Sequence, residues 1–137
     1  MIAGAYTGSM LAGLLVLNSG SSTPTLAVDL SDGVKHYIKT NDTNRYLYDE
    51  IKHEGVAVDL TECSVVLLMT DEDTVSIRQD ATVLDAVLGT VAYYPGATDF
   101  EVSGHYRVEW EVTFPNGLVA TFPDINYRKL TLVQDLG

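Results

Sequence analysis

The chain has 137 residues, the length of a single domain whose core needs no disulfide or metal ion to hold it together. Nineteen acidic residues against eight basic ones give a formal net charge of −11, which repels nucleic-acid phosphates and anionic membranes, so neither is expected as a partner. The single cysteine, Cys63, excludes an internal disulfide, and its apolar neighbours predict a small buried side chain rather than a nucleophile.

Residues 1–28 differ from the rest of the chain because they include no charged residue and no histidine. Their apolar centre at 10–17 is too short to span a bilayer, and a secretory signal is not expected because no basic residue precedes it. An uncharged apolar segment needs a surface to bury against, so we expect an N-terminal arm that docks onto a neighbouring subunit. The alternative is that it adds a strand to its own domain. The residues expected to contact a partner are Tyr6, Met10, Leu11, Leu14, Leu15, Val16 and Leu17.

Residues 29–137 have the pattern of short strands separated by turn residues, without an amphipathic helix. Strands are expected at 34–39 and 45–52, separated by the turn-forming residues 40–44, and a short extended piece is expected at 56–60. The next strand, 63–69, is apolar on both faces, which predicts a central position in its sheet.

The second half continues with 75–87, whose weaker alternation predicts a strand with a bend, and with 90–94. The clearest pattern lies at 106–114, where Tyr106, Val108 and Trp110 begin an alternation of apolar and polar residues typical of a half-buried strand. Pro115-Asn116-Gly117 then predicts a tight turn into 118–122, and 128–133 is the closing strand.

Strands of this length and spacing, without helical crossovers, predict an all-β fold: an antiparallel immunoglobulin-like β-sandwich over residues 29–137, preceded by the apolar, uncharged N-terminal arm at 1–28. Trp110 is expected in the core of this sandwich.

Catalytic motifs are weak throughout the sequence. His36, His53 and His105 lie far apart, and none has a second ligand-type residue at the spacing of a zinc site. Ser103 precedes His105 without a nucleophile elbow, and Asp71-Glu72-Asp73 lacks the ligand spacing of a calcium loop. We therefore expect no enzyme, and no catalytic, cofactor-binding or metal-binding residue.

A series of short motifs occurs in an order that resembles a known family. The motifs are Lys39-Thr40-Asn41-Asp42-Thr43, Val58-Asp59-Leu60-Thr61, Gly89-Thr90-Val91-Ala92-Tyr93, Asp99, Ser103-Gly104-His105-Tyr106-Arg107-Val108-Glu109-Trp110-Glu111-Val112, Phe114-Pro115-Asn116-Gly117 and Thr121-Phe122-Pro123. Together, over about 34–133, they resemble the immunoglobulin-like N-terminal domain of the phage baseplate upper protein (BppU) family. The chain departs from the family pattern at Glu62, where a small residue is usual, and at Asn41, where glycine often stands; neither change threatens the fold.

The resemblance implies a non-enzymatic structural protein of a tailed phage virion, assembled in the host cytoplasm. Its role would be a baseplate, tail or neck adaptor that anchors fibre or receptor-binding components through protein–protein contacts. Its partners would be other virion proteins in a multi-copy symmetric assembly. Because the chain ends soon after the last expected strand, we expect the adaptor alone, without a receptor-binding head, or a small decorating subunit.

Two alternatives remain open from the sequence. One is a capsid (head) decoration protein, which would use the same sandwich on a different lattice. The other is a carbohydrate-binding module, in which Tyr93, Tyr94 or Trp110 would stack on sugars. The place of Trp110 in the alternating strand favours the core, whereas Tyr93 and Tyr94 are adjacent and point to opposite faces, which leaves one of them exposed.

Overall fold

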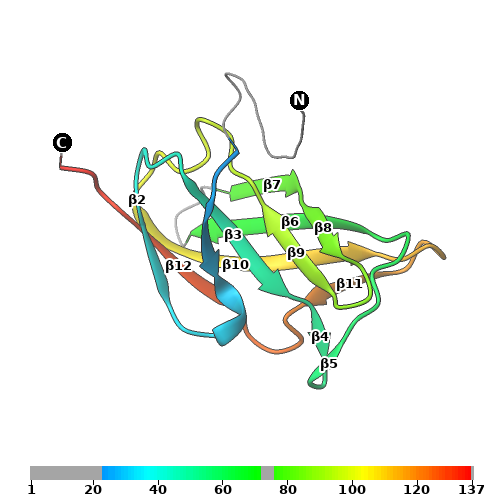
Figure 1. Ribbon diagram of the computed structural model, residues 1–137. Coiled ribbons are helices and arrows are strands. Elements are labelled where there is room, and N and C mark those ends of the chain that lie inside the picture. Colours follow the sequence, from blue (N-terminus) through cyan, green and yellow to red (C-terminus); the bar gives the residue numbers. More distant parts are fainter. Residues whose placement is uncertain (1–22, 72–75, 137) are drawn as a thin grey trace, which may run out of the picture.

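The computed structural model describes residues 23–71 and 76–136 of the chain. Two β-sheets pack against each other in this part of the chain (Figure 1). The helical structure within it is a single 3₁₀ turn, Leu30–Asp32. The all-β sandwich predicted from the strand spacing is therefore confirmed.

The two layers are named sheet A and sheet B. Sheet A has the strand order β1 (Leu26–Asp29), β3 (Arg45–Glu50), β9 (Thr90–Tyr93) and β8 (Thr82–Asp85). Sheet B has the order β2 (His36–Lys39), β12 (Arg128–Val133), β10 (Gly104–Thr113), β6 (Ser64–Asp71) and β7 (Ser76–Asp80), and β11 (Val119–Phe122) also pairs with β10. A small hairpin of β4 (Lys52–His53) and β5 (Val56–Ala57) extends from one end.

The sandwich differs from the predicted antiparallel arrangement at two strand pairs. Strand β1 runs parallel to β3, and β2 runs parallel to β12, while the other pairs are antiparallel. Between β1 and β3 the chain leaves sheet A through the 3₁₀ turn and passes along β2 of sheet B before it returns, and most of the chain lies between β2 and β12. Parallel pairs require such a crossover, whereas consecutive strands in a hairpin pair antiparallel. The immunoglobulin-like form of the sandwich stays a prediction.

The boundary predicted at Val28 falls inside β1. Val28 belongs to the buried core, and Asp29 caps the following turn by accepting a hydrogen bond from the Ser31 backbone N–H at 2.9 Å. Residues 26–28 are thus part of the sandwich, as in the alternative that the segment adds a strand to its own domain. The seven predicted contact residues lie in 1–22, outside the described residues.

The remaining strand predictions agree with the structure in position; the closing strand 128–133 has the predicted bounds, and the others differ in length. The expected strand 45–52 is interrupted at Ile51, and only Val56–Ala57 of 56–60 is a strand. The predicted bend in 75–87 lies at Ala81, where the chain passes from β7 in sheet B to β8 in sheet A. The central strand β6 lies between β10 and β7, as its two apolar faces predicted.

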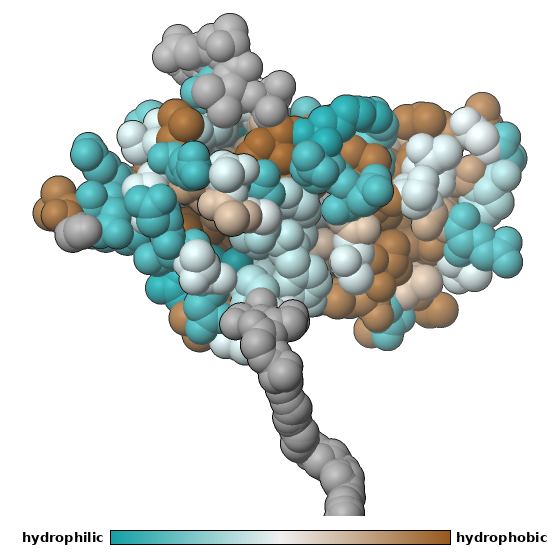
Figure 2. All heavy atoms as spheres, turned by 90° about the horizontal axis from the view of Figure 1, so that it is seen from above, coloured by the Kyte–Doolittle hydropathy of each residue, from teal (hydrophilic) through white to brown (hydrophobic). Residues whose placement is uncertain are grey.

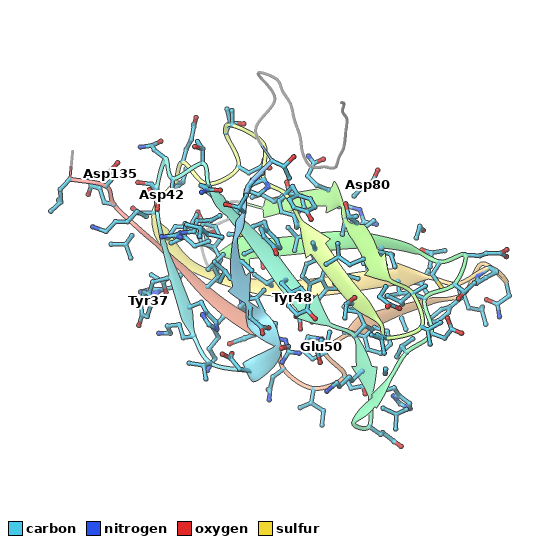
Figure 3. All side chains as sticks on the ribbon, in the orientation of Figure 1. Tyr37, Asp42, Tyr48, Glu50, Asp80 and Asp135 are labelled. Atoms are coloured by element: carbon cyan, nitrogen blue, oxygen red, sulfur yellow. The ribbon has the colours of Figure 1, made fainter. Side chains whose placement is uncertain are left out.

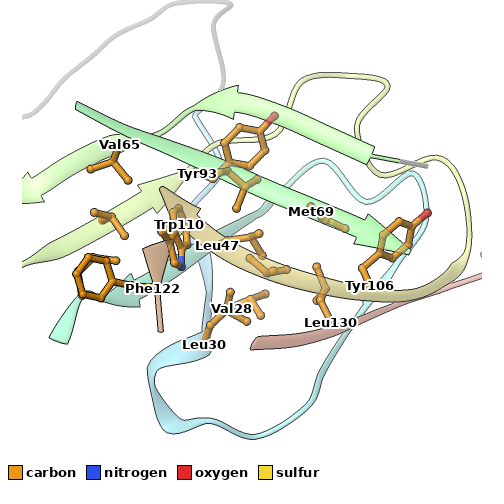
Figure 4. Packing of buried hydrophobic residues seen from close by; sticks show 14 of the residues in the cluster. Val28, Leu30, Leu47, Val65, Met69, Tyr93, Tyr106, Trp110, Phe122 and Leu130 are labelled. Carbon is orange, nitrogen blue, oxygen red and sulfur yellow. The ribbon is translucent and has the colours of Figure 1, made fainter. Parts of the chain in front are cut away.

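The core lies between the sheets and is built from the inward residues of the alternating strands (Figure 4). Trp110 is fully buried, as predicted, and so are Leu47 on β3, Leu67 on β6 and Val108 on β10. Burial of each such side chain contributes about 1.5–3 kcal/mol, so a core drawn from both sheets fixes their relative position. The outer faces of the two sheets are therefore rigid surfaces.

The β10–β11 hairpin closes through the predicted turn. Gly117 has φ +86°, a conformation that glycine adopts without strain, and the Asn116 side-chain oxygen accepts a hydrogen bond from the Leu118 N–H at 3.0 Å. The Phe114 N–H donates to the Leu118 carbonyl at 2.9 Å. This turn connects β10 to β11, and the two strands pair antiparallel up to Thr113 and Val119 beside it.

Candidate partner-binding surfaces

A buried charged cluster holds the two sheets together and thereby positions both outer faces. Asp49 on β3 is 1% exposed, and its Oδ2 accepts hydrogen bonds from Trp110 Nε1 at 2.8 Å and from Arg128 Nε at 2.9 Å. Its Oδ1 accepts from Arg128 Nη2 at 3.0 Å and from the Glu50 backbone N–H at 2.7 Å. Because Asp49 lies on sheet A while Trp110 and Arg128 lie on sheet B, this bidentate pair bridges the layers.

This cluster was not predicted from the sequence, although one signal for it exists. Along β3, Asp49 has the same parity as Leu47, so the period of two places its carboxylate on the inward face. An inward carboxylate requires a partner, since burying an unpaired charge is costly. That partner is Arg128, which is 79 residues away in the sequence, so no local pattern identifies it.

The three histidines each have a separate polar neighbour. His36 Nε2 lies 3.0 Å from Asp32 Oδ1, and this hydrogen bond, with another from the Val34 N–H, lowers the pKa of the exposed Asp32 carboxyl below its usual value. His53 Nδ1 lies 3.0 Å from Asp124 Oδ2. His105 Nδ1 lies 2.9 Å from the Thr131 hydroxyl. Within the described ranges, no three His, Cys, Asp or Glu side chains are grouped so that they could hold a metal ion.

Cys63 is half-buried beside β6 and packs against the core. Burial raises the pKa of its thiol, and the nearby Asp59 carboxylate raises it further. A raised pKa keeps the sulfur protonated near neutral pH, whereas an activated nucleophile needs the thiolate. The expected role of Cys63 as a small apolar side chain agrees with this setting, although the side chain is only partly covered.

The aromatic residues proposed as alternative sugar contacts are separated by the fold. Trp110 is fully buried and its indole N–H is bonded to Asp49, while Tyr93 is 4% exposed and its hydroxyl donates to Asp99. Tyr94 faces outward, as its neighbour's inward position predicted, and its ring centroid lies 5.1 Å from that of Tyr46. Of the three side chains, only Tyr94 is exposed on a surface.

The outer face of sheet B carries a shallow hollow of about 200 Å³, which we call the basic trough. Arg107 on β10 and Lys129 on β12 are directly opposite each other in the strand register, and Lys35 precedes β2 at the same level. The Arg107 guanidinium lies over the Tyr127 ring, 5.6 Å from its centroid. The lining is completed by residues of β10 and β12, including His105, Thr131, Tyr106 and Leu130.

The outer face of sheet A has the opposite charge. Glu50 on β3 and Asp85 on β8 flank Thr90 of β9 in the strand register, and Asp29 of β1 is opposite Tyr48. Because Leu47 and Asp49 point inward, Tyr48 and Glu50 point outward, and Figure 3 labels both on this face. We call this surface the acidic face; Tyr46 and Tyr94 lie on it as well.

Hydrophobic residues are distributed unevenly over the rest of the surface. Figure 2 shows them interspersed with hydrophilic residues on the upper side, and more frequent toward the end that carries the β10–β11 turn. Leu118 and Val119 in this hairpin are 67% and 56% exposed. Among the helical residues that the structure describes, none forms a helix long and apolar enough to cross a membrane.

The sequence matches one protein family, and the structure is similar to solved structures. The family described as the BppU N-terminal domain matches residues 27–122, which is most of the described sandwich. The N-terminal domain of phage TP901-1 ORF48 has a similar structure, with a TM-score of 0.55 and 12% sequence identity over 80% of this chain and 97% of that chain. At this identity the likeness supports the fold.

A second solved structure is similar at a lower level. CopC from Methylosinus trichosporium OB3b has a TM-score of 0.46 and 13% identity over 75% of this chain and 87% of that chain, a similarity too low to support an inference. No curated protein matches the sequence.

Proposed function

The chain belongs to the BppU N-terminal domain family, and from this premise we propose that it is a non-enzymatic structural component of a tailed phage virion. In this role it is a baseplate, tail or neck adaptor that anchors fibre or receptor-binding components through protein–protein contacts. The observation that carries the proposal is the family match over residues 27–122, and the likeness to the ORF48 domain of phage TP901-1 over nearly all of that domain supports it.

The surfaces of the sandwich suit such an adaptor. A core shared by two sheets, with Asp49 bridging them, keeps the outer faces in a fixed relation, which favours a protein that holds other proteins in place. The basic trough and the acidic face offer charged and aromatic side chains, which are common at protein interfaces.

The N-terminal arm is the proposed attachment device. Its uncharged sequence and the apolar residues Met10, Leu11, Leu14 and Leu15 are suited to burial against a neighbouring virion protein. Because the first strand that the structure describes begins at Leu26, the arm can be altered at 1–22 without removing any described strand. The proposed partners of the arm are other proteins of the virion.

Deletion of residues 1–22 tests the attachment. The truncated chain is expected to remain folded, as measured by circular dichroism, but to be absent from purified particles, as measured by quantitative mass spectrometry of the particle proteins. A matched variant that replaces Leu11, Leu14 and Leu15 by serine keeps the length of the chain and should give the same loss. Incorporation of both variants at the wild-type level would contradict the anchoring role of the arm.

Cryo-electron microscopy of the intact particle tests the location. Density for the sandwich at the baseplate, tail or neck is the expected result. Density on the capsid lattice would instead support the capsid decoration alternative. The carbohydrate-binding alternative loses its principal aromatic residue because Trp110 is buried, and a titration with soluble glycans is expected to give no saturable change in tryptophan fluorescence.

A further inference from the structure

The cations of the basic trough have no carboxylate partner within the described part of the chain. In the parts of the chain that the structure describes, Lys35, Arg107 and Lys129 form no ion pair with a carboxylate. The basic residues that do form one are Arg45, Lys52, Arg78 and Arg128. In a chain with nineteen acidic residues and eight basic ones, three neighbouring unpaired cations form a local positive surface on a negative molecule.

The trough also has the side chains of an interface. Tyr127 supports the Arg107 guanidinium from below, and Tyr37 on the neighbouring strand β2 is 63% exposed and points away from the sandwich (Figure 3). Tyrosine and arginine are enriched at protein interfaces because each combines a large contact area with polar groups. The trough therefore fits a protein surface that presents carboxylates.

The acidic face of the same chain presents such carboxylates. Asp29, Glu50 and Asp85 lie on the outward positions of three strands of sheet A. Among them, Glu50 forms an ion pair with Lys52 at 3.3 Å. Tyr46 and Tyr94 add two rings in contact to this face, tilted by 32° with respect to each other. The trough and the acidic face are thus complementary in charge and similar in aromatic content.

We propose that copies of this chain associate head to tail, with the basic trough on sheet B of one copy seated on the acidic face of sheet A of the next. Such a contact uses different surfaces on the two copies, so it closes into a ring or continues as a filament. A symmetric contact of trough against trough would place cations opposite cations. The inference rests on the multi-copy part of the proposed function and assigns the surfaces that make the contact.

The net charge of −11 does not oppose this contact at physiological salt. Charges separated by more than the Debye length, about 8 Å at 0.15 M, are largely screened from one another. The repulsion between two copies is therefore weak outside the interface, while the facing charges of the trough and the acidic face lie within that distance.

Sedimentation velocity of the purified full-length chain tests the proposal at low and high salt, roughly 0.1 M and 1 M. The wild type is expected to form concentration-dependent oligomers at low salt that dissociate at high salt. Charge reversal of the trough with Arg107→Glu and Lys129→Glu should weaken association about tenfold or more, since both side chains would repel the acidic face. If the charge-reversed variant is unstable, the milder variant with Arg107→Gln and Lys129→Gln takes its place in the same measurement and should also weaken association.

A matched control and a mixing experiment define the surfaces. Arg45→Glu with Arg78→Glu makes the same change in net charge outside the trough and should leave association unchanged. Reversal of the acidic face with Glu50→Lys and Asp85→Lys should abolish self-association as well. A mixture of the two reversed variants should associate again, because each then supplies the face that complements the other.

Three results would overturn the proposal. The wild type could stay monomeric at both salt concentrations, or the trough variant could associate as strongly as the wild type. In the third, the control variant would lose as much self-association as the trough variant. The test needs only the purified chain. Its failure is therefore distinguishable from failure of the virion role, which is read from particle composition and cryo-electron microscopy.

Discussion

Asp49 on sheet A links the two sheets through its hydrogen bonds to Trp110 and Arg128 on sheet B. Its carboxylate is 1% exposed and accepts four hydrogen bonds, two of them from Arg128. Removing two charges from water is costly, and here the cost is offset by a bidentate geometry in which both carboxylate oxygens are satisfied. The cluster thus favours one alignment of sheet A on sheet B.

Asp49→Asn is expected to lower the free energy of unfolding by about 3–5 kcal/mol, because it leaves the partly buried Arg128 guanidinium without its counter-charge. Urea unfolding followed by tryptophan fluorescence measures the loss. Asp42→Asn is the matched control: its carboxylate lies 3.8 Å from Arg45 at an exposed site, so we expect less than about 1 kcal/mol. Equal losses in the two variants would contradict a special role for Asp49.

Tyr93 makes a second residue-scale prediction, on alkaline pH. Burial raises the pKa of its hydroxyl above the ordinary value of 10, and the hydrogen bond to Asp99 raises it further. The folded state therefore keeps this proton after the unfolded state has lost it. The stability contributed by the protonated hydroxyl is complete below pH 10 and falls as the pH rises above it, by up to about 1.4 kcal/mol per pH unit.

Tyr93→Phe should remove this part of the alkaline slope, although it also lowers stability at neutral pH by deleting a hydrogen bond. Urea unfolding at several values from pH 9 to pH 11 measures the slope in both proteins. Val91→Ala, another core substitution on β9, should lower stability by the same amount at every pH. A slope that is unchanged in Tyr93→Phe would show that other groups cause the alkaline loss.

At the scale of elements, the strands with one buried face were predictable from the sequence alone. β10 and β6 have a clear period of two, and the turn at residues 115–117 has residue types that specify its geometry. β1 was not predicted as a strand because its first three residues, 26–28, close an uncharged segment, and composition placed the boundary after Val28. Its strand conformation depends on pairing with β3, which starts at Arg45, so no local pattern specifies it.

Two truncations measure the contribution of β1. Deletion of 1–22 is expected to leave the free energy of unfolding within about 0.5 kcal/mol of the wild type, because it keeps every strand that the structure describes. Deletion of 1–29 removes Val28 from the core and the cap that Asp29 gives to the 3₁₀ turn, and should cost at least about 2 kcal/mol. Urea unfolding compares the two. Equal stability would mean that β1 adds nothing to the sandwich.

At the scale of the whole molecule, the sequence predicts the total charge but not its arrangement. The trough forms because β10 and β12 pair in a register that sets Arg107 opposite Lys129, and because β2 brings Lys35 to the same level by a parallel pairing. The strands were predictable from their local patterns, but this register between distant segments was not. The acidic face has the same origin, since Asp29, Glu50 and Asp85 come from three strands that only sheet A brings together.

This arrangement gives a prediction for salt and stability. A net charge of −11 makes the folded chain repel itself, and salt screens that repulsion as the Debye length falls from about 10 Å at 0.1 M to about 3 Å at 1 M. Sodium chloride over this range should raise the free energy of unfolding by about 1 kcal/mol, which corresponds to a few degrees in the thermal midpoint. Chloride is the suitable anion because sulfate also strengthens apolar burial.

The variant with Arg107→Glu and Lys129→Glu sharpens this measurement, because each reversal makes the net charge two units more negative and removes a cation that offsets the surrounding carboxylates. At low micromolar concentration, where copies are apart, it should be less stable than the wild type at 0.1 M salt and should gain more from added salt. A thermal midpoint that falls with salt in both proteins would mean that ion pairs such as Arg78–Glu111 and Arg128–Asp49 outweigh the repulsion. The expected rise of the thermal midpoint with salt requires that repulsion among the unpaired charges changes more with salt than the attraction within these ion pairs does. The ion pairs then stabilise the fold mainly through their geometry and burial.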